Sequence, residues 1–189
     1  MELDKFLDFW RHADTLKRMP RAGWARRDVR NPETIGAHSF GTALLAMLLC
    51  RAEKADVDMG KALKMALVHD LAEAVTGDIT HYDPGYDKKD KMEREALLKM
   101  AANLEPEAAG EIIKLNEEFM EGKTEEAKLV KRADKLDMFL TAHFYEKEGY
   151  DMGGFYLEKN ARYNTYPFTT EFTRGMMAFL KSKREAGAI

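Results

Sequence analysis

The chain has 189 residues, 45% of them hydrophobic and 33% charged, which is ordinary for a globular protein of one domain. Its formal net charge of −3 argues against a nucleic-acid polymer as the main partner, because proteins of that class usually carry a strongly basic face. The single cysteine, Cys50, excludes an internal disulfide and indicates an intracellular protein.

The N-terminus does not resemble a signal peptide, because no basic segment precedes an apolar one. The longest apolar run, residues 42–50, is shorter than the roughly 18 residues that a membrane-spanning helix needs. We therefore expect a soluble, cytoplasmic protein with no membrane partner.

The first half of the chain has helical periodicity, and prolines lie only between the periodic segments. Helices are predicted over residues 2–19, 34–54 and 59–75. An irregular, arginine-rich segment, 20–33, separates the first two, and residues 76–90 form a connection long enough to be a lid or binding loop. The predicted core positions are Phe6, Phe9, Trp10, Ala13, Leu44, Leu45, Leu48, Leu49, Leu63, Ala66, Leu67, Leu71 and Ala74.

The second half repeats this pattern. Thr124 is a plausible N-cap, and Pro106 suits the first turn of a helix. Helices are predicted over residues 91–103, 106–122, 124–148, 155–163 and 167–183. No segment has convincing strand alternation. The predicted fold is an all-α, single-domain helical bundle over residues 1–183, followed by a frayed tail over residues 184–189.

Polar side chains interrupt the otherwise apolar helix predicted over residues 59–75. His69, Asp70 and Glu73 lie where such a helix should be buried. An unpaired buried carboxylate is costly, so it is paired, binds a metal or takes up a proton. Glu73 shares a helix face with the other two residues.

Two further helices supply polar side chains that can join this group. His38 lies in the first turn of one, and Asp134 lies near the inward edge of another. Together with His69 and Asp70 they offer two imidazoles and two carboxylates to one divalent transition metal: manganese, iron, cobalt, nickel or zinc. A water on that ion is the expected nucleophile. Asp137 could take the place of Asp134 as the acidic ligand. Asp134 could instead pair with the neighbouring lysines or arginines on its helix.

The segment before His38 combines arginines with an aromatic residue. Such a combination suits a mononucleotide, because arginine forks bind phosphate and an aromatic ring can stack on a base. The alternative is a solvated basic loop in which Trp24 closes the core. The arginines are Arg18, Arg21, Arg26, Arg27 and Arg30.

The order of these residues resembles the HD-domain superfamily of metal-dependent phosphohydrolases, and within it the HD-domain 5′-deoxynucleotidases. One departure is that Ala37 precedes the first histidine, where that family often has an acidic residue. The matching stretches are LKRMPRAGW at 16–24, ALVHDLAE at 66–73 followed by Gly77-Asp78, and EAK at 126–128 followed by Val130, Lys131 and Asp134.

The resemblance implies an HD-type fold, a homodimer and hydrolysis of deoxynucleoside 5′-monophosphates to nucleoside and phosphate. It implies that Glu73 orients or deprotonates the attacking water, or protonates the leaving oxygen. Asp78 would lie near the sugar, Trp24 would stack on or wall off the base, and Arg21 is the first choice for phosphate. The implied metal ligands are His38, His69, Asp70 and Asp134.

Other functions fit the same residues. An HD-type enzyme could act on another phosphate ester: a nucleoside triphosphate, a cyclic nucleotide or an alarmone. A nucleotide-binding regulator without turnover would keep the fold, whereas a helical scaffold with buried ion pairs would bind no metal. For a homodimer, Met138, Met176 and Met177 could supply an apolar face.

Overall fold

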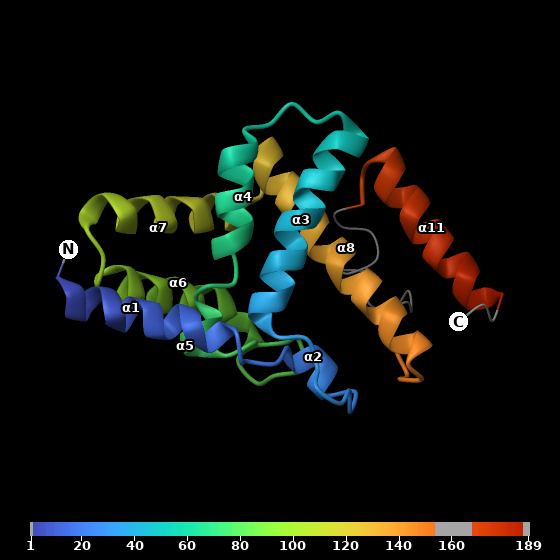
Figure 1. Ribbon diagram of the computed structural model, residues 1–189, viewed down its shortest axis with the longest axis horizontal. Helices are drawn as coiled ribbons and strands as arrows, with labels where there is room; N and C mark the ends of the chain where they lie inside the picture. The colour runs from blue at the N-terminus through green and yellow to red at the C-terminus, as the bar shows by residue number, and fades with distance from the viewer. Residues whose placement is uncertain (1, 154–167, 187–189) are drawn as a thin grey trace.

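The computed structural model describes residues 2–153 and 168–186, which contain helices and no β-strand (Figure 1). This agrees with the predicted all-α class. The helix predicted over residues 155–163 and the start of the last one at Pro167 lie outside the described residues. The helices are α1 (Leu3–Leu16), α2 (Ala22–Ala25), α3 (Ile35–Glu53), α4 (Met59–Val68), α5 (Glu73–Thr76), η1 (Tyr86–Lys88), α6 (Lys89–Ala101), α7 (Pro106–Glu121), α8 (Glu125–Lys147) and α11 (Glu171–Glu185).

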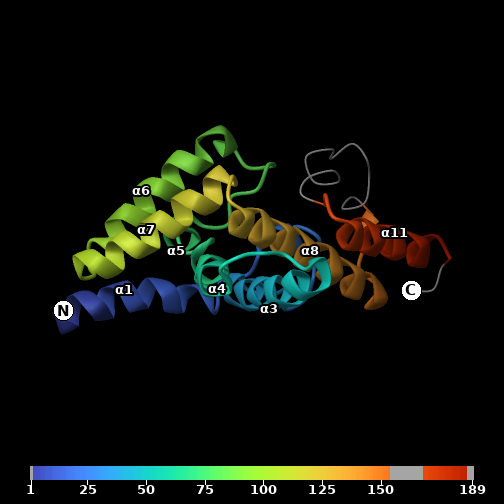
Figure 2. The same ribbon diagram turned by 90° about the horizontal axis from the view of Figure 1, so that it is seen from above.

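Helices α3, α4 and α8 form the centre of the molecule and pack against one another (Figures 1 and 2). Helices α3 and α8 each begin after a threonine whose side-chain oxygen accepts a hydrogen bond from a backbone N–H of the first turn. Thr34 accepts from Ala37, and Thr124 accepts from Ala127. Between these helices lies the larger of two apolar cores. Its members include Ala46, Leu49, Met65, Leu129, Leu136 and Phe139.

A smaller core lies between α1, α5 and α6, to one side of this centre. Val68, the last residue of α4, touches both cores. The residues that follow Val68 therefore connect the two cores. The buried members of the smaller core are Phe9, Leu16, Ile35, Leu71, Ala72, Ala96, Leu97 and Met100.

The prediction of one continuous helix over residues 59–75 is wrong. Helix α4 ends at Val68 and α5 begins at Glu73, with tight turns between them. Leu71 N donates to Val68 O and Glu73 N to Asp70 O, three residues back rather than four. Asn116 of α7 donates its side-chain amide to the carbonyl of His69, which replaces a helical partner. The break thus falls at the predicted metal ligands.

The segment between α1 and α3 is irregular, as predicted, apart from the single turn α2. It is fastened at both ends, because Arg21 N donates to Glu33 O and Ile35 N donates to Met19 O, each at 2.9 Å. These bonds hold the segment against the start of α3.

Some predicted core positions are wrong because α3 turns a different face inward. Leu44 and Leu48 are 45% and 56% exposed, whereas His38 and Thr42 are fully buried beside α8. The hydrophobic pattern alone favours the leucine side, but the polar side faces the molecular interior. Phe6, Trp10 and Leu67 are also exposed. Met138 is buried and offers no free apolar face, whereas Met176 and Met177 are half-buried against the larger core.

By length and composition, α3 could cross a membrane, with a mean hydropathy of 1.3 over an 18-residue window. The apolar run over residues 42–50 is shorter than this window, because polar residues of α3 lie before Thr42. A core helix of a soluble protein meets the same criterion, and α3 packs against α4 and α8.

Candidate metal centre and active site

His38 lies one turn into α3 and is fully buried. Its Nδ1 lies 2.7 Å from Oδ2 of Asp137 on α8. An ionised carboxylate only accepts, so Nδ1 carries the ring proton and Nε2 keeps its lone pair. Gly41 permits this approach, because a Cβ at that position would overlap the Asp137 carboxylate. The ring is thereby held in the tautomer that a metal ligand requires.

His69, at the end of α4, is oriented by the backbone. Its Nδ1 lies 2.8 Å from the carbonyl oxygen of Ala66, so the proton again belongs on Nδ1. Nε2 is buried and has no hydrogen bond of acceptable geometry among the described residues. A buried nitrogen in this condition is a candidate ligand atom.

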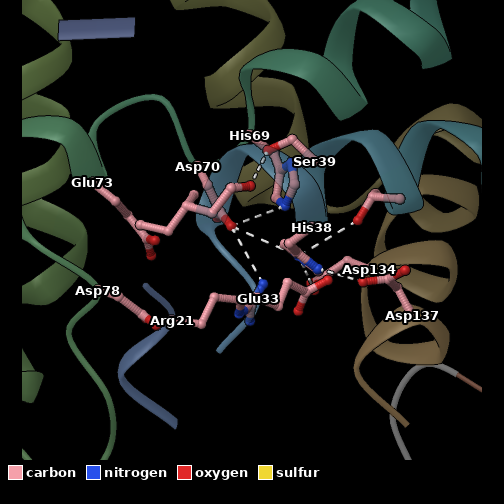
Figure 3. A network of polar contacts seen from close by, with 12 residues as sticks. Arg21, Glu33, His38, Ser39, His69, Asp70, Glu73, Asp78, Asp134 and Asp137 are labelled. Atoms are coloured by element: carbon pink, nitrogen blue, oxygen red, sulfur yellow. Dashed lines mark hydrogen bonds and ion pairs between the residues drawn. The ribbon is translucent and has the colours of Figure 1, made fainter. Parts of the chain in front are cut away.

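Two carboxylates approach these nitrogens (Figure 3). Oδ2 of Asp70 lies 3.2 Å from Nε2 of His69 and 3.8 Å from Nε2 of His38. Oδ1 of Asp134, on α8, lies 3.3 Å from Nε2 of His38. Ligand atoms of His38, His69 and Asp134 all lie within 4.8 Å of one another. The four predicted ligands, which we call the ligand cluster, are therefore brought together from α3, the α4–α5 turn and α8.

The ligand cluster fits a divalent transition metal. Burial tends to raise the pKa of both carboxyls, but nearby positive charge outweighs it. His69 holds the pKa of Asp70 well below its usual range. Lys135 and His38 do the same for Asp134. The two carboxylates and the two imidazole Nε2 atoms form a mixed oxygen and nitrogen set, which suits such a metal better than calcium. We therefore treat this site as a candidate metal centre.

The charge on His69 depends on Asp70. Burial tends to lower the pKa of the imidazole, but the Asp70 carboxylate outweighs it and raises the pKa to about 9. At neutral pH a divalent cation must therefore displace a proton from His69.

Glu73 begins α5 and is buried beside a lysine that the sequence did not single out. Its Oε1 lies 3.1 Å from Nζ of Lys89, and the same ammonium lies 3.3 Å from Oε1 of Glu93. Burial and the charge of Asp70 raise the pKa of Glu73, and Lys89 opposes them. Glu73 can therefore exchange a proton next to the ligand cluster.

Arg21 and Asp78 come from different segments and lie together beside the ligand cluster (Figure 3). Nη1 of Arg21 lies 3.9 Å from Oδ2 of Asp70, and this nitrogen is buried without a hydrogen bond. Oδ2 of Asp78 accepts from the backbone N–H of Ala22 at 2.7 Å. Arg21 thus has a donor available for an anion, and Asp78 fixes the segment that carries it.

Of the two predicted roles of Trp24, stacking on a base or walling it off, the structure contradicts the first. The side chain is 1% exposed and packs edge-on against Tyr145, with ring centroids 5.3 Å apart. Its Nε1 donates to Oε2 of Glu33 at 3.0 Å. A ring enclosed in this way offers no free face, so Trp24 closes the core behind Arg21.

Sequence reasoning missed the roles of Asp137 and Lys89. Asp137 was weighed only as a rival of Asp134, yet it lies behind His38 and supplies the acid that Ala37 does not. One signal was present, since Asp137 lies one helical turn after Asp134. Lys89 gave no signal, because it is one of several lysines at the start of a charged helix.

The chain matches a family model described as HD domain over residues 13–174. Among curated proteins, it is 35% identical over 156 residues to "5′-deoxynucleotidase HDDC2" of Dictyostelium discoideum, covering 79% of this chain and 82% of that protein. It is 36% identical over 141 residues to "5′-deoxynucleotidase HDDC2" of Homo sapiens, covering 74% and 68%.

Solved structures give the same picture. The PH0347 protein of Pyrococcus horikoshii OT3 superposes with a TM-score of 0.73 at 35% identity, covering 96% of this chain and 97% of that one. A predicted metal-dependent phosphohydrolase of Magnetospirillum magnetotacticum MS-1 superposes with a TM-score of 0.62 at 27% identity, covering 75% and 72%.

Proposed function

The chain belongs to the HD-domain family, and we propose that it is a metal-dependent phosphohydrolase that converts deoxynucleoside 5′-monophosphates to nucleoside and phosphate. Similarity to several curated 5′-deoxynucleotidases over about three quarters of the chain supports this reaction. The observation that carries the proposal is the meeting of His38, His69, Asp70 and Asp134 next to a buried arginine with a free donor.

The metal ligands in this proposal are the members of the ligand cluster. A divalent ion bound there would supply a water of lowered pKa, which could act as a nucleophile near neutral pH. The nitrogen and oxygen donors favour manganese, iron, cobalt, nickel or zinc. Asp137 orients His38 from behind, and the backbone of Ala66 does the same for His69.

The remaining residues act on the substrate and on protons. Arg21 binds phosphate oxygens and neutralises the charge that develops on them. Glu73 accepts the proton of the attacking water while the bond between phosphorus and the 5′-oxygen breaks. The 5′-oxygen takes that proton from Glu73, so the products are the nucleoside hydroxyl and phosphate. Asp78 lies beside Arg21, where it can contact the sugar and disfavour a ribose 2′-hydroxyl.

Phosphate release from a panel of deoxy- and ribonucleoside 5′-monophosphates tests this proposal. Chelated protein is resupplied with manganese, cobalt or zinc, beside an Asp70→Ala variant. We expect turnover that needs metal, favours deoxy substrates and is lost in the variant. Metal-loaded protein that releases no phosphate from any monophosphate would overturn the substrate assignment.

We also propose that the protein is a cytoplasmic homodimer. Exposed apolar side chains gather on α1, α3 and α4, which line one face of the molecule (Figure 2). Each of these side chains exposes on the order of 100 Å² of accessible surface. Together they provide an area close to the ~800 Å² that each partner buries in a standard interface. The residues are Leu3, Phe6, Leu7, Trp10, Phe40, Leu44, Met47, Leu48 and Leu67.

Sedimentation of the wild type and of a Phe40→Glu, Leu44→Glu variant tests the dimer. We expect the wild type to sediment as a dimer and the variant as a folded monomer. Glutamates at Met120 and Leu98, which are 39% and 37% exposed on α7 and α6, serve as the control. A monomeric wild type would overturn the dimer, and a dimeric variant would overturn this choice of face.

A further inference from the structure

Lys89 is the first residue of α6 and reaches from that helix to Glu73 at the start of α5. Its Nζ lies 3.1 Å from Oε1 of Glu73 and 3.3 Å from Oε1 of Glu93, one turn further along α6. One ammonium therefore lies between two carboxylates, one of which borders the ligand cluster.

The burial of this group distinguishes it from an ordinary surface ion pair. The side chains of Glu73, Lys89 and Glu93 are 5%, 22% and 13% exposed. On the same helix, Lys91 and Glu95 are 81% and 58% exposed and lie 3.9 Å apart. An exposed pair contributes little, whereas removing one partner from a buried group leaves an uncompensated charge. Lys89 is therefore the cation on which a buried carboxylate at the site depends.

We propose that Lys89 is a positioning residue for the hydrolytic reaction. Its ammonium holds Oε1 of Glu73 and leaves Oε2 for the attacking water, while Glu93 holds the ammonium in place. This inference rests on the proposed function and deepens it. Lys89 opposes the rise in the pKa of Glu73 that burial and Asp70 cause, so it increases the share of ionised carboxylate that can accept a proton from water.

The other charged groups around Glu73 explain why a dedicated cation is needed. Asp70 in the α4–α5 turn and Asp78 in the following loop both act against a negative charge on Glu73. Arg21 acts in its favour, but its guanidinium is directed to Asp70 and, in the proposed reaction, to phosphate. Within residues 2–153 and 168–186, the observed ion pair of Glu73 is with Lys89.

Kinetics of Lys89→Met, Lys89→Arg and the matched control Lys91→Met test the inference, with Mn²⁺ as the metal and dAMP as the substrate. We expect Lys89→Met to lower kcat by about 10- to 100-fold, since general-base catalysis as a whole contributes ~10²–10⁴-fold. KM and bound metal should stay within about twofold of the wild type. Lys89→Arg should restore part of kcat, and Lys91→Met should behave as the wild type. A loss confined to KM or to metal content would overturn the inference.

A second measurement does not depend on turnover. The side-chain carboxyl of Glu73 is followed by carbon-13 NMR in zinc-loaded protein labelled at glutamate, and Glu73→Gln identifies its signal. We expect Lys89→Met to raise the pKa of Glu73 by at least about 1 unit, because an opposite charge at this distance typically shifts a pKa by 1–3 units. Lys91→Met should not move it. An unchanged titration in Lys89→Met would overturn the inference.

The two measurements separate the possible failures. If the wild type releases phosphate from no monophosphate but the Glu73 signal responds to Lys89, the substrate assignment fails and the positioning role stands. Glu93→Gln provides the same test if Lys89→Met does not fold, as judged by its melting temperature. We expect it to lower kcat by several-fold in the same direction. Full activity in a folded Glu93→Gln variant would remove Glu93 from the arrangement.

Discussion

The ligand cluster and the two loops beside it are built in different ways. The cluster is carried by the long helices α3 and α8 and by the turn that joins the two cores, and its histidines are buried. The loops, residues 17–34 and 77–88, face each other through a few polar contacts. Such contacts include the bond from Ala22 N to Asp78 and the ion pair between Arg26 and Asp83.

This difference separates two properties of the site. Metal affinity depends on side chains whose positions are set by core packing and by buried partners, which are costly to disturb. In the proposed reaction, substrate handling depends on Arg21 and Asp78, which lie on segments outside the long helices. We therefore expect variants in the two regions to affect different measured quantities.

The largest effect that would test this separation is expected for Arg21→Gln. Its guanidinium donor is buried beside Asp70 without a hydrogen bond, so its loss removes a charged phosphate contact. Removal of one such donor typically costs ~10²–10³-fold in rate. Phosphate release should fall by about that factor, while the metal content of the protein stays unchanged.

Arg18→Gln is the matched control, because Arg18 belongs to the same arginine-rich stretch but is 70% exposed and paired with Asp14. It should leave kcat/KM within about twofold of the wild type, since an exposed pair contributes little. A loss of metal in Arg21→Gln would contradict the separation of the two regions.

The next effect is expected at Asp137, on the metal side of the comparison. Asp137→Asn removes the acceptor that fixes the tautomer of His38, and such outer partners typically contribute 10- to 100-fold in metal affinity. We expect a rise of about that size in the apparent Kd for Mn²⁺, measured by competition with a chelator. With saturating metal, KM should be near that of the wild type.

Gly41→Ala tests the same contact from the other side. A Cβ on Gly41 overlaps the Asp137 carboxylate and must displace it from His38. The apparent Kd for Mn²⁺ should rise in this variant as well, whereas Gly110→Ala on α7, where a Cβ meets nothing, should not change it. Unchanged affinity in both Asp137→Asn and Gly41→Ala would remove Asp137 from the metal side of the site.

Much of the metal side was predictable from the sequence, because a buried polar group is conspicuous in an apolar helix. The pattern indicated His38, His69, Asp70 and Asp134, and the structure brings them together. It could not indicate that α4 ends at Val68, because that break depends on Asn116 of a helix distant in the sequence. Contacts between remote segments leave no local periodicity.

The loop side was less predictable for the same reason. The arginine-rich stretch was evident, but the ring of Trp24 is buried rather than available to a base. Its burial depends on Tyr145, which reaches it from α8, and on Glu33 at the far end of the same segment. Lys89 was missed because nothing in its own helix distinguishes it from Lys91, which points to solvent.

The change in metal affinity over one pH unit should be smaller than the changes expected for Arg21→Gln and Asp137→Asn. The Asp70 carboxylate raises the pKa of His69 to about 9 in the metal-free fold, against an ordinary value of 6.5. Its charge therefore stabilises the metal-free fold fully below pH 6.5, and this contribution disappears as the pH rises through 9. A divalent cation requires the neutral ring, so its apparent affinity should rise by up to about tenfold per pH unit from pH 6.5 to 9.

Calorimetry in two buffers of different ionisation enthalpy measures this effect directly. Binding of Mn²⁺ at pH 7.5 should release about one proton, because the raised pKa keeps His69 protonated before the metal binds. Asp137→Asn should not change that number, since Asp137 contacts His38 instead. An affinity independent of pH would show that His69 is already neutral at pH 7.5.

The smallest effect is expected from the ion pair between the loops. Arg26 and Asp83 are 45% and 26% exposed, and Asp83 also accepts from the backbone and hydroxyl of Thr80, so Arg26→Gln removes the link without disturbing the second loop. Because an exposed pair is weak and is screened by salt, KM should rise only about two- to threefold at low ionic strength. The difference should vanish at high salt, while kcat and metal affinity stay constant.

Arg11→Gln, which breaks a comparable surface pair on α1, should leave KM unchanged at every salt concentration. If Arg26→Gln instead lowered metal affinity, the loops would contribute to the ligand cluster, and the two regions would have to be treated as one.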